Sequence, residues 1–345
     1  MSASSPERAR PDACPGAIAV HQAADGGLAR VRVPGGTLTA AQFTAVTNAA
    51  GDLGDGTLEL TSRANIQIRG LKPGAEGELA DRLWQVGLLP SLTHERVRNI
   101  IASPLGDDQH LVDELDRAIC AEPALAALPG RFLVTVDSGV GDVSGLGGDI
   151  GLQGDALLLA GQDTGLRVAD AVAAVVRAAH EFQAIRGDAW RLAEVPDGVA
   201  RVVSVFGSPG AARLSVRPPV ALPPGPVGDV FVVGAPLGRL TQDQARALSA
   251  SWVRLTPWRS VVVPELPSAA GLITSPSSPW HGVTACTGRP GCAKSLADVR
   301  ADAAASIPTR TSTLPVHWSG CSRRCGKPAG AVDVVATDDG YRRNE

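Results

Sequence analysis

Four of the six cysteines lie within the last 60 residues of this 345-residue chain, where they form two pairs. Five residues separate Cys286 from Cys292, and three separate Cys321 from Cys325. Glycine and proline surround both pairs, which places the thiols in loops. Four thiolates that converge are the ligands of a cubane iron–sulfur cluster. The spacing therefore predicts that these four cysteines hold a [4Fe–4S] cluster.

Three other interpretations of the cysteines compete with the cluster. Disulfides need an oxidising compartment, and the polar N-terminal segment has no apolar stretch that would indicate export. A structural zinc site is the main alternative, but zinc modules favour two to four residues between paired cysteines. Inert core cysteines would not need loops rich in glycine and proline. The pattern therefore favours iron–sulfur over zinc.

The composition excludes several classes of protein. The formal net charge is −3, which gives no electrostatic footprint for nucleic acid. No apolar run reaches the roughly 18 residues that a membrane span needs. Hydrophobic residues make up 44% of the chain and aromatic residues only 3%, so Val, Leu and Ala must fill the core. We expect a cytoplasmic protein that binds neither nucleic acid nor a membrane.

An internal repeat connects residues 33–42 with residues 235–244. Five identical residues recur in register, namely Pro34, Gly36, Leu38, Thr39 and Gln42 as Pro236, Gly238, Leu240, Thr241 and Gln244. Each copy continues into an alanine-containing helical stretch and then into a strand with a Leu-Thr pair. This order indicates a duplicated unit.

The expected elements are mixed. Thr39 and Thr241 are predicted N-caps for helices over 40–50 and 242–251. A further helix over 293–306 would place Cys292 at a helix N-terminus, where the dipole and free amides stabilise a thiolate. Strands and helices follow one another without regular βαβ alternation, so the sequence predicts an α+β fold.

Together these features resemble the nitrite/sulfite reductase superfamily, in which ferredoxin-like half-domains occur twice and cysteines with this spacing hold a [4Fe–4S] cluster. Within the superfamily the chain is similar to the precorrin-3B synthases of aerobic cobalamin biosynthesis. The similarity extends from about residue 12 to residue 341. It is carried by the segments CPGA at 14–17, LTSRANIQIRG at 60–70, RNIIASP at 98–104 and WHGVTAC at 280–286.

The resemblance implies a division of the chain into four parts. Residues 12–75 and 201–270 would be the two ferredoxin-like half-domains of a pseudo-duplicated fold. Residues 271–345 would bind the cluster. Residues 76–200 would form a central α+β domain that corresponds to the cluster domain but lacks its cysteines.

The resemblance also implies roles for single residues. Cys286, Cys292, Cys321 and Cys325 would be the cluster ligands, with Cys325 bridging to the iron of a siroheme. Basic residues would face the active site or bind the carboxylates of a tetrapyrrole. They are Arg63 and Arg98, expected to act in catalysis and binding, and Arg69 and Arg131, expected to bind only.

One departure from the superfamily pattern bears on the substrate. The reductases carry a Lys-x-Lys pair that helps to bind the oxyanion, and the matching segment here reads Arg131-Phe132-Leu133. Reduction of a small oxyanion needs several converging cations, so the leucine favours another substrate. The resemblance then implies an oxygen-dependent monooxygenase that hydroxylates precorrin-3A and closes a γ-lactone.

The implied cofactors are the [4Fe–4S] cluster and a second iron, either siroheme or a mononuclear centre. The reaction would use O2 and electrons that come ultimately from NADH, delivered by a separate reductase or ferredoxin, because no nucleotide-binding motif is found in the chain. A siroheme-dependent sulfite or nitrite reductase is the alternative enzyme. A non-catalytic iron–sulfur electron carrier is the alternative from another class.

Overall fold

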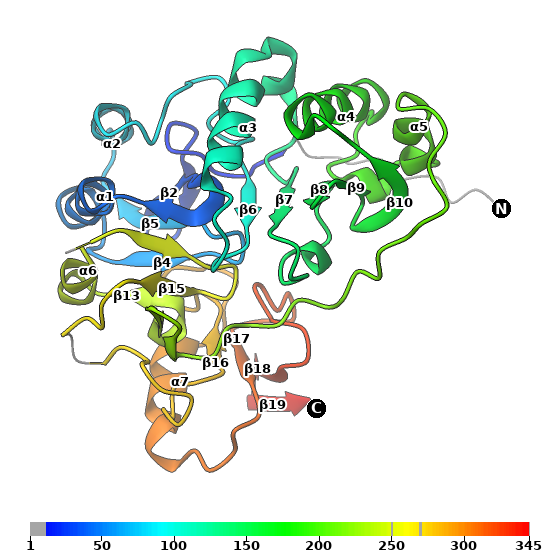
Figure 1. The fold of residues 1–345 in the computed structure, drawn as a ribbon. Coiled ribbons are helices and arrows are strands. Elements are labelled where there is room, and N and C mark those ends of the chain that lie inside the picture. Colours follow the sequence, from blue (N-terminus) through cyan, green and yellow to red (C-terminus); the bar gives the residue numbers. More distant parts are fainter. Residues whose placement is uncertain (1–11, 250, 269–270, 345) are drawn as a thin grey trace.

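The computed structural model describes residues 12–249, 251–268 and 271–344. Ala269, Ala270 and Glu345, which end two of the predicted segments, and Ala250 in the predicted helix 242–251 lie outside the described residues. Within the described part, the strands form three five-stranded sheets and one four-stranded sheet. Helices cover these sheets, and strands and helices do not alternate regularly. The predicted α+β class is confirmed (Figure 1).

The first sheet belongs largely to the N-terminal repeat. In spatial order its strands are β1 (His21–Ala23), β2 (Gly26–Val31), β5 (Ile66–Leu71), β4 (Leu58–Leu60) and β13 (Arg239–Leu240). All neighbouring strands are antiparallel. The last strand comes from the second repeat, about 180 positions further along the chain.

The second repeat builds a sheet of the same form. Its strands are β11 (Gly225–Val227), β12 (Val230–Gly234), β15 (Ser260–Val263), β14 (Val253–Leu255) and β3 (Thr37–Leu38). Here the edge strand β3 comes from the first repeat and pairs with β14. Each repeat therefore donates a two-residue strand to the sheet of the other. The predicted pseudo-duplication is confirmed.

Helix capping is repeated as well. The side chain of Thr39 accepts a hydrogen bond from the backbone N of Gln42 and begins α1 (Ala40–Leu53). Thr241 and Gln244 do the same for α6 (Gln242–Leu248). In both cases the glutamine side chain returns a bond to the threonine N–H, which completes a capping box. Both predicted N-caps are thus correct.

One hydrophobic core serves both half-domains. It joins Phe43 and Val46 of α1, Leu79 of α2 (Glu76–Gln85), and residues of the second repeat such as Leu240 and Leu255. Helices α1, α2 and α6 lie on one side of the two sheets (Figure 1). Burial of these aliphatic side chains holds the halves together, and the exchanged strands add backbone hydrogen bonds.

The central domain carries the third sheet. Its strands are β6 (Ile100–Ala102), β7 (Val134–Asp137), β8 (Ile150–Gln153), β9 (Ala156–Leu159) and β10 (Gln162–Arg167), and its helices are α3 (Gln109–Ala121), α4 (Ala171–Ile185) and α5 (Gly198–Ser204). Strands β6, β7 and β8 are parallel, and β9 is antiparallel to β8. A separate core of aliphatic side chains lies between this sheet and its helices.

The C-terminal sheet repeats this pattern. It consists of β16 (Val283–Ala285), β17 (Val316–Ser319), β18 (Val332–Thr337) and β19 (Gly340–Asn344), with α7 (Val299–Ser306) between the first two strands. Strands β16, β17 and β18 are parallel, and β19 is antiparallel to β18. The strand order and directions match those of β6 to β9, with α7 in the place of α3.

Short 3₁₀ helices complete the described structure. They are η1 (Pro34–Gly36), η2 (Pro123–Ala127), η3 (Ser144–Leu146), η4 (Leu192–Glu194), η5 (Pro236–Gly238) and η6 (Ile307–Thr309). The proline-rich segment before β11 is extended and runs from the central domain to the second repeat (Figure 1). Among the described residues, no helix has both the length and the apolar character required to cross a bilayer.

The predicted helix over 293–306 is wrong in its first half. Helix α7 starts at Val299, and the side chain of Asp298 caps it through the backbone N of Ala301. The preceding backbone is engaged elsewhere, because the N–H of Leu296 donates to the carbonyl oxygen of Gly320 at 2.8 Å. Cys292 therefore lies in a turn, and a helix dipole does not act on its thiol.

Candidate functional site

Both cysteine loops leave the same edge of the C-terminal sheet. Cys286 directly follows β16, and Cys321 comes two residues after the end of β17. Because these strands are parallel neighbours, their carboxyl ends lie side by side, and the loops that follow them meet. The N–H of Cys286 donates to the carbonyl of Trp318, and the N–H of Gly320 contacts the Sγ of Cys286 at 3.2 Å.

The four predicted ligands act on one another electrostatically. The pKa of the Cys325 thiol is raised by burial and then by the nearby thiols of Cys286, Cys321 and Cys292. In the described part of the chain, no three His, Cys, Asp or Glu side chains converge closely enough for a single metal ion. A cubane cluster takes one thiolate for each iron, so its four ligands surround a larger volume. The thiol donor set fits such a cluster.

Arg69 ties the first cysteine loop to the first half-domain. Its guanidinium makes two bonds to the carboxylate of Asp25, and its Nη2 donates to the carbonyl oxygen of Gly291 at 2.9 Å. Burial alone would lower the pKa of Arg69, but the bonds to Asp25 raise it above the ordinary value. A side chain at position 291 would collide with Asp25, so glycine allows this close approach. Arg69 therefore positions the residue next to Cys292.

Arg259 makes the corresponding contact with the second loop. It comes from the second half-domain, and its Nη2 donates to the carbonyl oxygen of Gly326 at 3.0 Å. His317 is fully buried near Arg259. The backbone of Cys325 lies beside its ring, and its Nδ1 is 2.9 Å from the hydroxyl of Thr284. Burial and the charge of Arg259 lower the pKa of His317 to about 4, so the ring is neutral at neutral pH.

Arg63 lies in a tight turn between β4 and β5 and faces the central domain. Its Nη1 donates to the carbonyl oxygen of Gly130 at 3.2 Å. Burial, and then the positive charges of Arg191, Arg30 and Arg131, lower the pKa of Arg63 to about 10. A bound anion would relieve this repulsion, because it would place negative charge among the guanidinium groups.

Two arginines that the sequence reasoning missed join this group. Arg30 is in β2, and Arg32 follows two positions later, so both lie on the same face of the chain. Both guanidinium groups contact the Sγ of Cys14. Only 2% of Arg32 is exposed, and its Nη1 has no hydrogen-bond partner among the described residues. The alternating Arg-x-Arg pattern is the sequence signal that could have shown that the two side chains share a face.

The Arg131-Phe132-Leu133 segment directly follows Gly130, whose carbonyl oxygen accepts the hydrogen bond from Arg63. Arg131 is exposed, and its guanidinium lies 5.6 Å from the centre of the Trp190 ring. The side chain of Leu133 is buried in a small cluster with Ile101 and Val143. The position of the missing lysine is thus filled by an apolar side chain that packs inside the protein.

Arg98 lies apart from the arginine group, which consists of Arg30, Arg32, Arg63, Arg131 and Arg191. Only 3% of it is exposed, and its Nε and Nη2 bind the two carboxylate oxygens of Asp116 at 2.8 and 2.6 Å. Its Nη1 donates to the carbonyl oxygen of Leu88. All three groups of this guanidinium are engaged inside the protein, which makes it a tie between α3 and the segment before β6.

Residues 21–85 match the family model of the nitrite/sulfite reductase ferredoxin-like half domain. A precorrin-3B synthase of Sinorhizobium sp is 26% identical over 380 residues, which cover 96% of this chain and 82% of that protein. A ferredoxin–nitrite reductase of Synechococcus elongatus is also 26% identical, over 87% of this chain and 74% of that protein.

The solved structure of the NirA protein of Mycobacterium tuberculosis has the same fold. It covers 92% of this chain and 73% of its own, with a TM-score of 0.71 and 19% sequence identity. The matched half domain and the shared fold are those of the nitrite/sulfite reductase superfamily. The predicted superfamily and its pseudo-duplicated fold are therefore confirmed, and the relatives are oxidoreductases.

The central domain has a second loop edge, which corresponds in position to the edge that carries the cysteine loops. Asp137 ends β7 as Ser319 ends β17, and its carboxylate accepts from the backbone N–H groups of Gly139, Gly141, Val143 and Ser144. These bonds order the glycine-rich segment as a turn-rich connection. The edge that corresponds to the cysteine loops is thus closed by hydrogen bonds within the chain.

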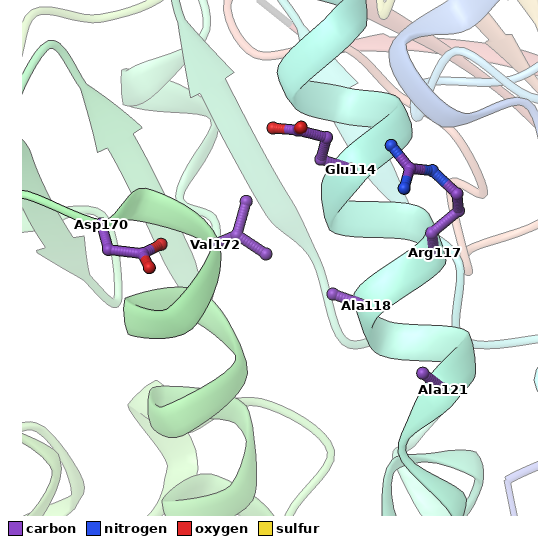
Figure 2. A pocket seen from close by; sticks show the side chains of 6 residues that line it. All are labelled: Glu114, Arg117, Ala118, Ala121, Asp170 and Val172. Atoms are coloured by element: carbon purple, nitrogen blue, oxygen red, sulfur yellow. The ribbon is translucent and has the colours of Figure 1, made fainter.

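A groove of about 540 Å³ lies elsewhere on the central domain, between α3 and the start of α4. Figure 2 shows the carboxylate of Glu114 pointing from α3 toward Asp170 and Val172 on the opposite side. Arg117, Ala118 and Ala121 complete its lining. The lining includes no residue of the cysteine loops or of the arginine group, so the groove is not the site described above.

Proposed function

We propose that this chain is a precorrin-3B synthase, which hydroxylates precorrin-3A with O2 and closes a γ-lactone in aerobic cobalamin biosynthesis. The observation that carries the proposal is the buried guanidinium of Arg32, with its unpartnered Nη1, beside Arg30 and Arg63. Burial, and then the charges of Arg30 and Arg63, lower the pKa of Arg32 to about 10. Such a group of cations fits a ligand with several carboxylates.

The arginines would bind and orient the macrocycle. Carboxylate side chains of precorrin-3A would accept hydrogen bonds from Arg32 Nη1 and from the free donors of Arg63 and Arg131. Bidentate bonds between guanidinium and carboxylate fix orientation as well as affinity. Arg191 is held by Asp149 and adds positive charge nearby. Leu133 supports this substrate over a small oxyanion, since it removes a cation that the reductases use.

The four cysteines would hold the [4Fe–4S] cluster, with Arg69 and Arg259 fixing the two loops through Gly291 and Gly326. When bound, the cluster and a second iron, siroheme or mononuclear, would supply one-electron transfer and oxygen activation. The thiol of Cys325 is the exposed member of the set, and a siroheme would be bridged through it.

A separate protein would deliver the electrons, which come ultimately from NADH. The loop around Cys325 exposes Arg323, whereas Arg324 forms an ion pair with Asp333, and Lys294 is exposed on the neighbouring loop. Basic side chains around the redox centre would attract a donor with an acidic surface, such as a ferredoxin, and increase its association rate. We place the protein in the cytoplasm.

One anaerobic preparation tests the proposal. Iron and sulfide analysis with a visible spectrum separates a cluster alone, a cluster with haem, and zinc. Incubation with precorrin-3A, O2 and a reductant should then yield the hydroxylactone. Protein that instead reduces sulfite or nitrite and leaves precorrin-3A unchanged would overturn the proposal in favour of a siroheme reductase, the alternative that the nitrite reductase match supports.

Two pairs of variants locate the functions within the chain. Cys325→Ser should lose most of the iron and sulfide, and Cys120→Ser, in α3, should retain both. Arg63→Met should raise KM for precorrin-3A about tenfold or more, the effect of losing a charged hydrogen bond. Arg82→Met, which removes a surface ion pair with Asp52 and Glu78, is the matched control and should leave KM unchanged.

A further inference from the structure

Cys14 lies in an unusual environment for a free thiol. Its Sγ is half-buried and contacts Arg30 Nη1 at 3.2 Å and Arg32 Nη2 at 3.4 Å. Arginine carries only donors, so the sulfur is the acceptor in both contacts. The carboxylate of Asp12 accepts hydrogen bonds from the backbone N–H groups of Cys14 and Gly130. Two guanidinium groups therefore surround the sulfur with donors and positive charge.

The remaining contact of the sulfur is with a backbone carbonyl. Sγ also lies 3.4 Å from the carbonyl oxygen of Gly130. That oxygen already accepts from Arg63 Nη1 at 3.2 Å and from Asn99 Nδ2 at 3.0 Å. A carbonyl oxygen has two lone pairs, and both are used by these donors. The S–H of Cys14 is thus a third, longer donor to this carbonyl, and the sulfur lone pairs accept from the two guanidinium groups.

We propose that Cys14 is a redox-reactive cysteine that hydroperoxides oxidise to a sulfenate, and that Arg32 Nη1 binds the added oxygen. The sulfur attacks one peroxide oxygen, an S–O bond forms and the O–O bond breaks. The sulfur loses two electrons and its thiol proton, the departing hydroxide takes that proton and leaves as water, and the sulfenic acid releases its own proton to solvent. The buried Nη1, without a partner, supplies the donor that the new oxygen requires.

The chain contains its own comparison thiol. Cys120 is half-buried at the end of α3, and burial raises its pKa to about 11, with the charge of Asp116 adding to the effect. A thiol of this kind is protonated at neutral pH and reacts slowly. Cys14 and Cys120 thus share a chain and a similar exposure and differ in the charge around the sulfur.

The consequence of oxidation rests on the proposed function. A sulfenate would place a negative oxygen against the arginines that are proposed to bind substrate carboxylates. It would compete with precorrin-3A and reversibly lower its affinity until a thiol reductant removed the oxygen. The reactivity of Cys14 itself does not depend on which substrate the protein takes.

Alkylation and peroxide labelling of the full-length, cluster-loaded protein test the inference. At pH 7, iodoacetamide should modify Cys14 at least tenfold faster than Cys120, measured by mass spectrometry of the two peptides. After brief exposure to hydrogen peroxide, dimedone should label Cys14 and not Cys120. Arg32→Met should slow alkylation of Cys14 about tenfold at pH 7 and move its pH profile upward, and Arg82→Met should leave both unchanged.

Two results would overturn the inference. One is alkylation of Cys14 no faster than that of Cys120 in the unmodified protein. The other is an Arg32→Met protein that keeps the cluster absorbance, and so is folded, but alkylates Cys14 with an unchanged rate and pH profile. Both readouts use protein without substrate, so their failure is distinct from a failure to form the hydroxylactone.

Discussion

Arg69 Nη2 lies 2.9 Å from the carbonyl oxygen of Gly291, the residue that precedes Cys292. Through this bond a strand of the first half-domain fixes a loop that is more than 200 residues away in the chain. The sequence reasoning assigned Arg69 to substrate or cofactor binding. The contact instead indicates a positioning role at the cluster, with Asp25 holding the guanidinium in place.

Replacement of Arg69 by methionine should loosen the first cysteine loop. We expect cluster loss to a chelator to accelerate about tenfold, since a charged hydrogen bond contributes about 1.5–3 kcal/mol. Decay of the visible absorbance measures this rate. Arg69→Lys keeps the charge but loses the fork that binds Asp25 and Gly291 together, so it should rescue only part of the effect. An unchanged rate in both variants would contradict the positioning role.

Arg98 should matter for stability rather than for the reaction. Arg98→Met leaves the carboxylate of Asp116 buried without its partner, and we expect a loss of about 3–5 kcal/mol in the free energy of unfolding. The double variant Arg98→Met with Asp116→Leu should recover much of this loss. Denaturant unfolding of the three proteins measures it. A stable Arg98→Met protein that fails to bind precorrin-3A would restore the catalytic role predicted from the sequence.

Asp137 should stabilise the central domain in a pH-dependent way. Burial raises its pKa, but the backbone bonds from Gly141, Ser144 and Val143 outweigh this and hold the pKa below its ordinary value of 3.8. Its contribution is therefore present above pH 3.8 and is lost as the pH falls through the lower folded value. Asp137→Asn should cost about 2–3 kcal/mol near pH 6, because a charged acceptor is lost.

The difference between Asp137→Asn and the unmodified protein should shrink as the pH falls below 3.8, and denaturant unfolding at a series of pH values measures it. Iron and sulfide content should not change, because the cysteine loops lie on another sheet. A stability difference that stays constant across this range would argue against the carboxylate as its source.

Reversal of charge beside Cys325 should slow electron delivery. Arg323→Glu is expected to reduce the rate of cluster reduction by an acidic ferredoxin about tenfold at low salt, since electrostatic steering increases association rates by 10 to 1,000-fold. The effect should fade at high ionic strength. Reduction by dithionite, a small molecule, is the control and should be unaffected. Equal rates with ferredoxin at low salt would place the docking surface elsewhere.

Local rules predicted the parts of the fold that depend on neighbouring residues. The two capping boxes at Thr39 and Thr241 and the repeat were visible because their signals span only a few positions. The false helix start after Cys292 shows the limit. Residues 293–298 have helical composition, but the bond from Leu296 to Gly320 comes from a loop far along the chain. Tertiary contacts of this kind leave no local pattern.

The residues of the candidate site also differ in how well the sequence alone could predict them. The four cysteines could be chosen from their spacing, which reflects the chemistry of the ligands. The arginines could not be sorted, because Arg63 and Arg98 look alike in sequence. Only the fold shows that Asp116 neutralises Arg98 while Arg63 faces other cations. The domain boundaries and the ligand roles of the cysteines stay predictions.

The exchange of strands β3 and β13 determines when the two sheets can be completed during translation of the chain. Strand β4 reaches its full set of neighbours only when Arg239 and Leu240 have been made. A ribosome that has released the first 100 residues therefore presents a half-domain whose sheet still has an open edge. Unlike a sheet that closes as it emerges, this one keeps the edge of β4 unpaired until about two thirds of the chain has been made.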